Sequence, residues 1–218
     1  MSSRRLYYSP GACSLAPHIV AEETGLPFEA VKVDFAAGEQ RSAAYLALNP
    51  KGRVPVLVDG DQVFTECPAI LRHLARRAPE AQLWPADPVE DTRCLEWLCW
   101  GSSGLHVAYA HVRRAERYAR SEGAKAEVIE QGKAACKTLW AQVEERLARG
   151  GAWAAGNRFS VADAYLFVFW LWGRGNVLGY DMMRDFPAWT ERMLRLAERP
   201  GFRRALAREG IALPQAGI

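Results

Sequence analysis

A proline-rich segment divides the chain into two parts with different hydrophobic patterns. Residues 79–88, PEAQLWPADP, contain three prolines in ten positions, which is typical of a linker. Before this segment, short alternating stretches are interleaved with helical spacing, and after it almost every apolar pattern has helical spacing. We therefore expect an α/β domain over residues 1–83, a linker over 84–90 and an all-helical domain over 91–218.

The first part predicts the element order β-α-β-α-β-β-α. RRLYYS is short and strand-prone, and the helical spacing that follows it ends at Gly25. FEAVKVDF alternates as a strand does, and AAYLALN is a short helical stretch. VPVLVDGDQVFTE predicts two strands joined by an Asp-Gly-Asp turn, and CPAILRHLARRA predicts the last helix. In the second part, Ser160 and Asp163 have the spacing of a capping box before an apolar helix.

Composition narrows the class of protein. Half of the 218 residues are apolar and the net charge is only +3, so we expect a globular chain that does not bind nucleic acid. The five cysteines form no C-x-x-C pair and no Cys/His cluster at zinc spacing, so we expect reduced thiols and no metal. Because no segment has the length of a signal peptide or a membrane span, we expect a cytoplasmic protein without a membrane partner.

One cysteine stands where a helix is expected to begin. In SPGACSLAPH, a Pro-Gly-Ala turn precedes Cys13, and the N-terminus of a helix stabilises a thiolate. Small neighbours leave the sulfur approachable. Position 16 is Ala, so no resolving cysteine follows at the usual spacing, which favours one cysteine that works with an outside thiol. The alternative is a buried and inert cysteine, and this stretch alone does not decide between the two.

Two further segments carry weaker signals. In NPKGRVPVL, Pro55 begins a strand and suits a cis bond, which leaves the backbone of Val54 to pair with an extended peptide. In FTECPAI, Cys67 is expected at the N-cap with Pro68 at N1, so this helix end can hold a carboxylate while Glu66 takes an ammonium. The alternatives are an edge-strand proline and plain capping. Together the three segments suit a ligand with a thiol, a peptide backbone, a carboxylate and an amine, and glutathione has all four.

With these motifs the sequence resembles a known family. YYSPGACSLAPHI, NPKGRVPVL, TECPAI and FSVADAYLF occur in the order found in cytosolic glutathione S-transferases of the bacterial beta class. The resemblance covers nearly the whole chain. It implies the glutathione transferase fold, in which a thioredoxin-like domain precedes an all-α helical domain. It also implies glutathione as co-substrate, a small hydrophobic electrophile as acceptor, and a homodimer.

The resemblance assigns roles to individual residues. It implies that Cys13 contacts the glutathione sulfur and can form a mixed disulfide with it, and that His106 lies near that sulfur, both as catalytic residues. The alternative for His106 is a helix histidine bonded to a neighbouring carbonyl. The implied glutathione-binding residues are Cys13, Val54, Pro55, Glu66, Cys67, Ser103 and His106. The implied acceptor pocket, between the domains, has walls from Pro10, Ala12, Tyr109, Arg113 and Trp172.

Three positions depart from the family pattern. Cys67 stands where Ser or Gly is usual, Cys99 where Asn is frequent, and Gly104 where an acidic residue is frequent. Three functions therefore remain as hypotheses. The first is a transferase that passes the glutathione thiolate to a hydrophobic electrophile. The second is a glutathione-dependent disulfide or peroxide reductase, or a dehalogenase, that works through a Cys13–glutathione mixed disulfide. The third is a non-catalytic binding protein on the same fold.

Overall fold

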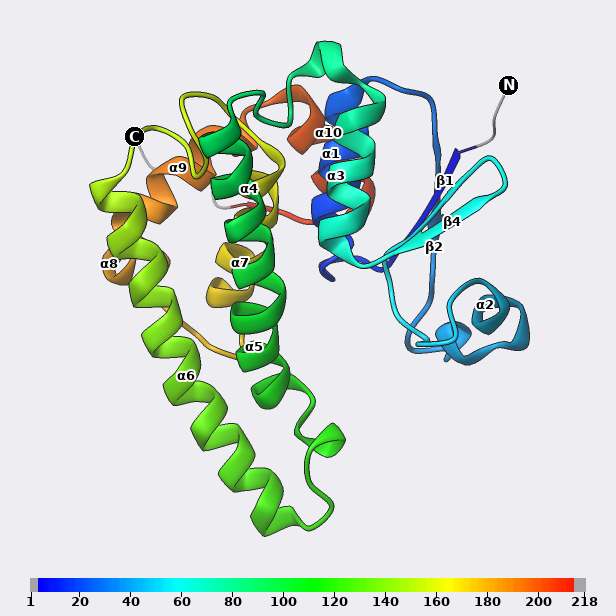
Figure 1. Cartoon of the computed structure of the whole chain (residues 1–218). Helices are drawn as coiled ribbons and strands as arrows, with labels where there is room; N and C mark the ends of the chain where they lie inside the picture. Colours follow the sequence, from blue (N-terminus) through cyan, green and yellow to red (C-terminus); the bar gives the residue numbers. More distant parts are fainter. Residues whose placement is uncertain (1–3, 214–218) are drawn as a thin grey trace. The chain divides into compact units, whose positions relative to one another are not determined.

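The chain folds into two compact units, which we describe separately (Figure 1). The computed structural model describes residues 4–213. Unit 1 comprises its residues 4–86 and 194–213, and unit 2 comprises residues 87–193.

Unit 1 is built on a four-stranded sheet with the strand order β2-β1-β3-β4. The strands are β1 (Arg4–Tyr8), β2 (Glu29–Lys32), β3 (Val56–Asp59) and β4 (Gln62–Thr65). β1 pairs in parallel with β2 and antiparallel with β3, and β3 pairs antiparallel with β4. The first three α-helices are α1 (Leu15–Thr24), α2 (Ala43–Leu48) and α3 (Cys67–Arg77). The order β-α-β-α-β-β-α that the sequence predicts is thereby confirmed.

A helix from the end of the chain completes unit 1. α10 (Pro200–Glu209) packs against α1, and α1, α3 and α10 lie together on one side of the sheet in Figure 1. Glu23 pairs with Arg199 at 2.6 Å, and Glu22 pairs with Arg204 at 2.6 Å. The compact units thus differ from the boundaries expected from the sequence, which gave residues 91–218 to one helical domain. The difference arises because a helical pattern does not say which core its apolar face will join.

Unit 2 is helical in its regular structure. Its α-helices are α4 (Pro88–Trp100), α5 (His106–Arg113), α6 (Glu122–Arg149), α7 (Val161–Arg174), α8 (Met182–Asp185) and α9 (Pro187–Ala197), whose last residues belong to unit 1. α7 is buried along nearly its whole length, which agrees with its apolar sequence. The predicted capping box is confirmed, since Ser160 and Asp163 exchange side-chain and backbone hydrogen bonds at its start.

The first helical stretch of unit 2 is interrupted by a π-helical turn, Gly101–Leu105, between α4 and α5. A Cβ atom on Gly101 would lie 2.8 Å from Cε1 of Tyr165 and 3.1 Å from Cε2 of Phe169. The glycine therefore permits two aromatic rings of α7 to pack directly against the backbone. Such turns are frequent at functional sites.

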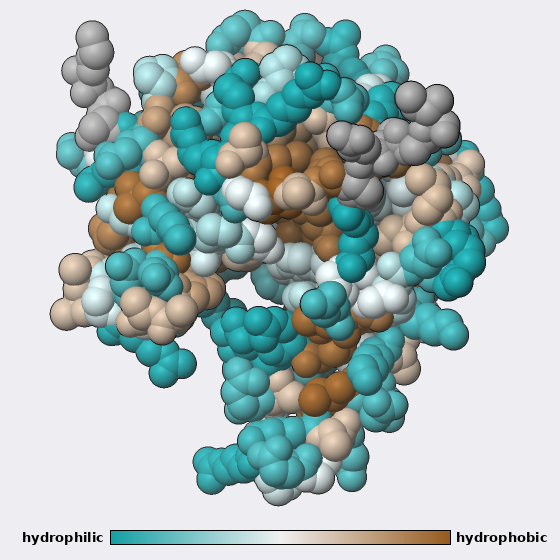
Figure 2. Space-filling model, turned by 180° about the vertical axis from the view of Figure 1, so that it is seen from behind, coloured by the Kyte–Doolittle hydropathy of each residue, from teal (hydrophilic) through white to brown (hydrophobic). Residues whose placement is uncertain are grey.

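On the face shown in Figure 2, hydrophilic residues cover most of the surface and hydrophobic residues lie in patches between them. Within residues 4–213, no helix combines the length and the apolar character that crossing a bilayer requires.

Candidate functional site

The turn that carries Cys13 is closed by its own hydrogen bonds. The Ala12 N–H donates to the Ser9 carbonyl at 3.0 Å, and the Ser9 N–H donates to the Ser14 hydroxyl at 3.1 Å. Gly11 has a φ of +68°, a left-handed conformation that glycine adopts without steric cost. α1 begins at Leu15, so Cys13 lies in the turn just before the helix.

The three segments that the sequence singled out separately meet at Cys13. The Cys13 thiol donates to the Val54 carbonyl at 3.5 Å, and the Cys67 thiol donates to the Cys13 carbonyl at 3.4 Å. Cys13 keeps 9% of its surface exposed and Cys67 keeps 4%. The Cys13 side chain is therefore less exposed than we expected from its small neighbours in the sequence.

The segment before β3 is held in a defined conformation. The Val54–Pro55 peptide bond is cis, as the position of this proline favoured. The Tyr45 hydroxyl and the Asn49 amide both donate to the Arg53 carbonyl, at 2.8 Å and 2.7 Å. Because β3 starts to pair at Val56, the Val54 backbone lies just outside the sheet, where it faces the Cys13 thiol.

The start of α3 differs by one residue from the expectation. Glu66, and not Cys67, is the N-cap, so Cys67 is the first residue of the helix. Glu66 has a φ of 73°, which costs a residue with a Cβ about 1–3 kcal/mol and is typical of residues that clamp ligands. Burial raises the pKa of the Cys67 thiol well above its usual value, and the neighbouring Cys13 side chain raises it further.

A cation at this helix end escaped the sequence interpretation. The Lys51 ammonium contacts the Glu66 carboxylate at 2.5 Å and donates to the Thr65 hydroxyl at 2.8 Å. Both charged side chains remain largely exposed. The sequence did contain a signal for Lys51, because this lysine stands in NPKGRVPVL, two residues after Asn49. A turn at this point leads the chain back toward β3.

Another residue that escaped the sequence interpretation comes from the far end of the chain. Glu209 of α10 accepts a hydrogen bond from the Gly11 N–H at 2.9 Å and lies 2.7 Å from Nδ1 of His18. It thereby holds the turn before Cys13 against α1. No local pattern could have found it, because the contact joins segments almost 200 residues apart.

The predicted site residues of unit 2 lie around α5. Tyr109 stacks on Trp172, with ring centroids 4.3 Å apart, and the His106 ring meets Trp172 edge-on at 5.0 Å. Burial raises the pKa of the Tyr109 hydroxyl. Ser103 lies in the π-helical turn, where its hydroxyl donates to the Cys99 carbonyl at 2.8 Å, and Arg113 is exposed at the end of α5.

The structure thus brings together two groups of predicted residues, one in each unit. In unit 1, Cys13, Val54 and Cys67 are in contact, Pro55 follows Val54 and Glu66 precedes Cys67. Pro10 and Ala12 lie in the turn beside Cys13, exposed and half-buried respectively. In unit 2, His106, Tyr109 and Trp172 form one aromatic cluster.

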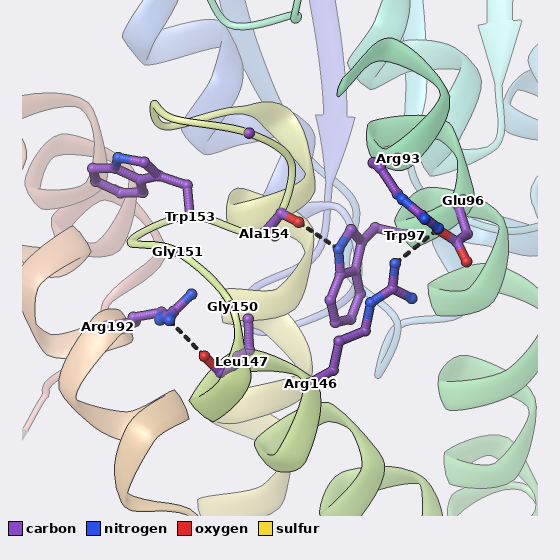
Figure 3. Close-up of a pocket in the computed structure, with 11 residues that line it drawn as sticks. Arg93, Glu96, Trp97, Arg146, Leu147, Gly150, Gly151, Trp153, Ala154 and Arg192 are labelled. Carbon is purple, nitrogen blue, oxygen red and sulfur yellow. Dashed lines mark hydrogen bonds and ion pairs between the residues drawn. The ribbon is translucent and has the colours of Figure 1, made fainter. Parts of the chain in front are cut away.

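A separate cavity in unit 2 contains none of these residues. It has a volume of about 460 Å³, and Figure 3 shows the side chains that line it. Arg146 lies over the Trp97 ring at 4.2 Å and pairs with Glu96 at 2.7 Å. Trp97 donates its ring N–H to the Ala154 carbonyl, and Arg192 donates to the Leu147 carbonyl, both at 2.7 Å. These contacts join α4, α6, α9 and the loop before α7. The side chains of Trp97, Arg146 and Arg192 therefore serve to hold these segments of unit 2 together.

The chemistry available at Cys13 is that of a thiol beside a backbone segment that lies outside the sheet. Among residues 4–213, no group of three or more His, Cys, Asp or Glu side chains is placed to hold a metal ion. Cys13 contacts both the Val54 carbonyl and Cys67, the first residue of α3. Together these neighbours offer partners for a sulfur, an extended peptide backbone and a carboxylate.

Comparison with known proteins gives matches over both parts of the chain. Residues 2–76 match the family described as "Glutathione S-transferase, N-terminal domain", and residues 106–200 match "Glutathione S-transferase, C-terminal domain". The chain is 34% identical to glutathione S-transferase GstA of Escherichia coli O157:H7, over 95% of this chain and 99% of that protein.

Solved structures of similar proteins agree with this match. A glutathione transferase homologue from Sulfitobacter with bound glutathione is 36% identical, covers 97% of this chain and 100% of its own, and has a TM-score of 0.89. The bacterial beta class glutathione S-transferase of Sphingomonas chungbukensis is 37% identical, covers 95% of this chain and 100% of its own, and has a TM-score of 0.81.

Proposed function

Because this chain belongs to the glutathione S-transferase family, we propose that unit 1 binds glutathione with the glutathione sulfur beside Cys13. The enzyme then transfers the glutathione thiolate to an acceptor. The observation that carries this proposal is the 3.5 Å contact between the Cys13 thiol and the Val54 carbonyl. It sets a sulfur next to the backbone segment that suits the cysteinyl part of an extended tripeptide.

The γ-glutamyl end of glutathione is assigned to the start of α3. Its carboxylate would accept hydrogen bonds from the first N–H groups of the helix, including that of Cys67, where the helix dipole favours negative charge. Its ammonium would pair with Glu66. Lys51, which contacts Glu66, lies close enough to share this end of the ligand.

Acceptor binding is assigned to the aromatic cluster of unit 2. Tyr109 and Trp172 offer stacked rings, which suit a hydrophobic electrophile. We include Pro10, Ala12 and Arg113 in this pocket and Ser103 in the glutathione site. The role assigned to His106 is to stabilise the glutathione thiolate, which attacks the electrophilic carbon while the leaving group departs with the electron pair of the broken bond.

A second candidate function is supported by the same cysteine. A thiolate at Cys13 can attack a disulfide and form a mixed disulfide with glutathione, which a hydroxyl residue cannot do. Disulfide reduction or reductive dehalogenation through this intermediate therefore stays an alternative to conjugation. After incubation with glutathione disulfide, mass spectrometry of the tryptic peptides would detect the adduct on peptide 6–32, whose only cysteine is Cys13.

Two properties complete the proposal. We propose a homodimer, on the ground of membership of this family. We also propose a cytoplasmic location, since the five cysteines are all free thiols in the structure and a reducing compartment would keep them so. Sedimentation of the purified protein and fractionation of cells test these two statements.

The decisive experiment combines binding with turnover. Glutathione binding is measured by calorimetry and conjugation with chlorodinitrobenzene by absorbance, for the wild type, Cys13→Ala and Cys136→Ala. Cys136 is a fully buried thiol in α6 of unit 2, and it serves as the matched control for glutathione binding by unit 1. We expect the wild type and Cys136→Ala to bind glutathione alike, and Cys13→Ala to lose most of its activity. A wild-type protein that neither binds glutathione nor conjugates it would refute the proposal and leave only the binding-protein hypothesis.

A further inference from the structure

The fold brings a second cysteine to Cys13. The sequence offers no resolving cysteine three residues after Cys13, because position 16 is Ala. In the structure, however, Cys67 is the first residue of α3, and its thiol lies 3.4 Å from the Cys13 carbonyl oxygen. The neighbouring Cys13 side chain also contributes to the raised pKa of the Cys67 thiol. Two thiols that are 54 residues apart in the chain thus form a pair.

We propose that Cys13 and Cys67 form a redox-active dithiol that reduces hydroperoxides, in which Cys13 is oxidised first and Cys67 resolves it by forming a disulfide. This activity goes beyond glutathione transfer. Its first half does not require glutathione at all, so the inference stands or falls independently of the proposed transferase reaction.

The geometry places the two cysteines side by side. A disulfide needs its Cα atoms within about 7 Å and its sulfur atoms about 2 Å apart. The Cys67 sulfur already lies 3.4 Å from the Cys13 carbonyl oxygen, so the Cys67 side chain reaches the Cys13 backbone. Both thiols now use backbone carbonyls as acceptors, so rotation of the two side chains toward each other breaks only two weak S–H hydrogen bonds.

Electrostatics decide which sulfur reacts first. Burial raises the pKa of the Cys67 thiol, and the Cys13 side chain raises it further, so Cys67 remains protonated and donates its S–H. Cys13 lies in the turn before α1 and is the more exposed of the two thiols, so an oxidant reaches it first. Once Cys13 has been oxidised to a neutral sulfenic acid, one cause of the raised pKa of Cys67 is removed, which favours attack by Cys67.

The Cys13 thiol gives up its proton, and the resulting thiolate attacks one oxygen of a hydroperoxide. The O–O bond breaks and Cys13 becomes a sulfenic acid, while the leaving oxygen takes up the released proton and departs as an alcohol or water. The Cys67 sulfur then attacks the Cys13 sulfur, the S–O bond breaks, and the oxygen leaves as water with the proton of the Cys67 thiol. Two thiols have lost two electrons, and the hydroperoxide has gained them. Two molecules of glutathione can return the disulfide to thiols and leave as glutathione disulfide.

Both thiols are nearly covered, which predicts the class of oxidant. With exposed fractions of 9% and 4%, the pair admits a small molecule such as hydrogen peroxide more readily than a protein disulfide. Hydrogen peroxide is therefore the probe for the test.

The primary test uses the wild-type protein without glutathione. The protein is treated with an equimolar amount of hydrogen peroxide, free thiols are alkylated, and trypsin digestion is followed by mass spectrometry. Cys13 lies alone in the tryptic peptide 6–32 and Cys67 lies alone in the peptide 54–72. We expect these two peptides joined, with the mass of their sum less two hydrogen atoms, and separated again by glutathione. Alkylated Cys67 together with Cys13 that is unmodified or oxidised to sulfinic acid would overturn the proposal.

Variants separate the roles of the two sulfurs. In Cys67→Ser, the resolving thiol is lost, and we expect the same equimolar treatment to leave Cys13 as a sulfenic acid, which dimedone traps. In Cys136→Ala, the disulfide between Cys13 and Cys67 should form as in the wild type. A Cys67→Ser protein whose Cys13 stays protected as in the wild type would contradict the role of Cys67. Failure of glutathione binding with an intact Cys13–Cys67 disulfide would refute the transferase proposal alone.

Discussion

Glu209 binds the backbone of Gly11 across 198 residues of sequence. Its carboxylate accepts the Gly11 N–H at 2.9 Å, in the turn that presents Cys13. The other carboxylate oxygen lies 2.7 Å from Nδ1 of His18, with both side chains fully buried. One acidic residue of α10 therefore fixes the turn before Cys13 and the first helix after it, which links the end of the chain to the site.

Removal of this carboxylate is expected to weaken both the fold and the site. In Glu209→Ala, the Gly11 N–H and the buried His18 ring lose their acceptor, so we expect the free energy of unfolding to fall by about 2–4 kcal/mol. The Kd for glutathione should rise because the turn at Cys13 loosens. Urea unfolding and calorimetry measure the two effects. Glu198→Ala removes an exposed carboxylate that pairs with Arg203 on the surface, and it should change neither quantity appreciably.

Replacement of Glu66 by glycine is expected to stabilise the fold and to weaken glutathione binding. Glycine tolerates the positive φ of 73° that Glu66 adopts, so Glu66→Gly should raise the free energy of unfolding by about 1 kcal/mol. The same change removes a carboxylate from the proposed γ-glutamyl site, and we expect the Kd for glutathione to rise about tenfold, which corresponds to about 1.4 kcal/mol.

A matched control exists in the same unit. Gln82 also has a positive φ, of 50°, and lies on the surface, outside the proposed site. Gln82→Gly should give a similar gain in stability without a change in glutathione affinity. Equal affinities for wild type and Glu66→Gly would remove Glu66 from the glutathione site.

Asp59 is expected to make unit 1 sensitive to acid. Burial alone would raise the pKa of this carboxyl, but the hydrogen bond from His73 and the ion pair with Arg4 outweigh it and hold the pKa below its usual value. A carboxyl with a lowered folded-state pKa contributes stability above its unfolded-state pKa, near about pH 4, and loses that contribution as the pH falls through the folded-state value.

The measurement is urea unfolding between neutral pH and about pH 2 for the wild type and Asp59→Asn. We expect Asp59→Asn to be less stable than the wild type at neutral pH. The difference should shrink as the pH falls below about pH 4, because the wild-type carboxyl then becomes neutral as well. Parallel curves for the two proteins over the whole range would show that Asp59 contributes nothing through its charge.

Gly101 is expected to tolerate no side chain. A Cβ at this position would lie 2.8 Å from the Tyr165 ring, so Gly101→Ala should lower the free energy of unfolding by about 1–3 kcal/mol. Gly123, near the start of α6, has open space around it, and Gly123→Ala should raise stability by about 0.5–1 kcal/mol. Thermal unfolding of both variants checks the contrast, and a stabilising Gly101→Ala would show that the π-helical turn is not set by the packing against α7.

Local sequence information was sufficient for the order of elements in unit 1 and for several local features of the chain. The order of strands and helices in unit 1, the capping box at Ser160 and the place of Pro55 before a strand all follow from residues close together in the chain. Periodicity, turn residues and caps act over a few positions, so their signals survive without any knowledge of the fold. Small errors remained at boundaries, as at α3, where the helix starts with Cys67 and the N-cap is Glu66.

Only the tertiary structure decided which of these elements meet. The approach of Cys67 to Cys13, the contact of Lys51 with Glu66 and the reach of Glu209 to Gly11 join residues that no local pattern relates. The assignment of α10 to unit 1 has the same origin. The sequence of an amphipathic helix shows that the helix has an apolar face, but it does not show which partner covers that face. Packing between distant segments fixes these contacts, and the candidate site consists almost entirely of them.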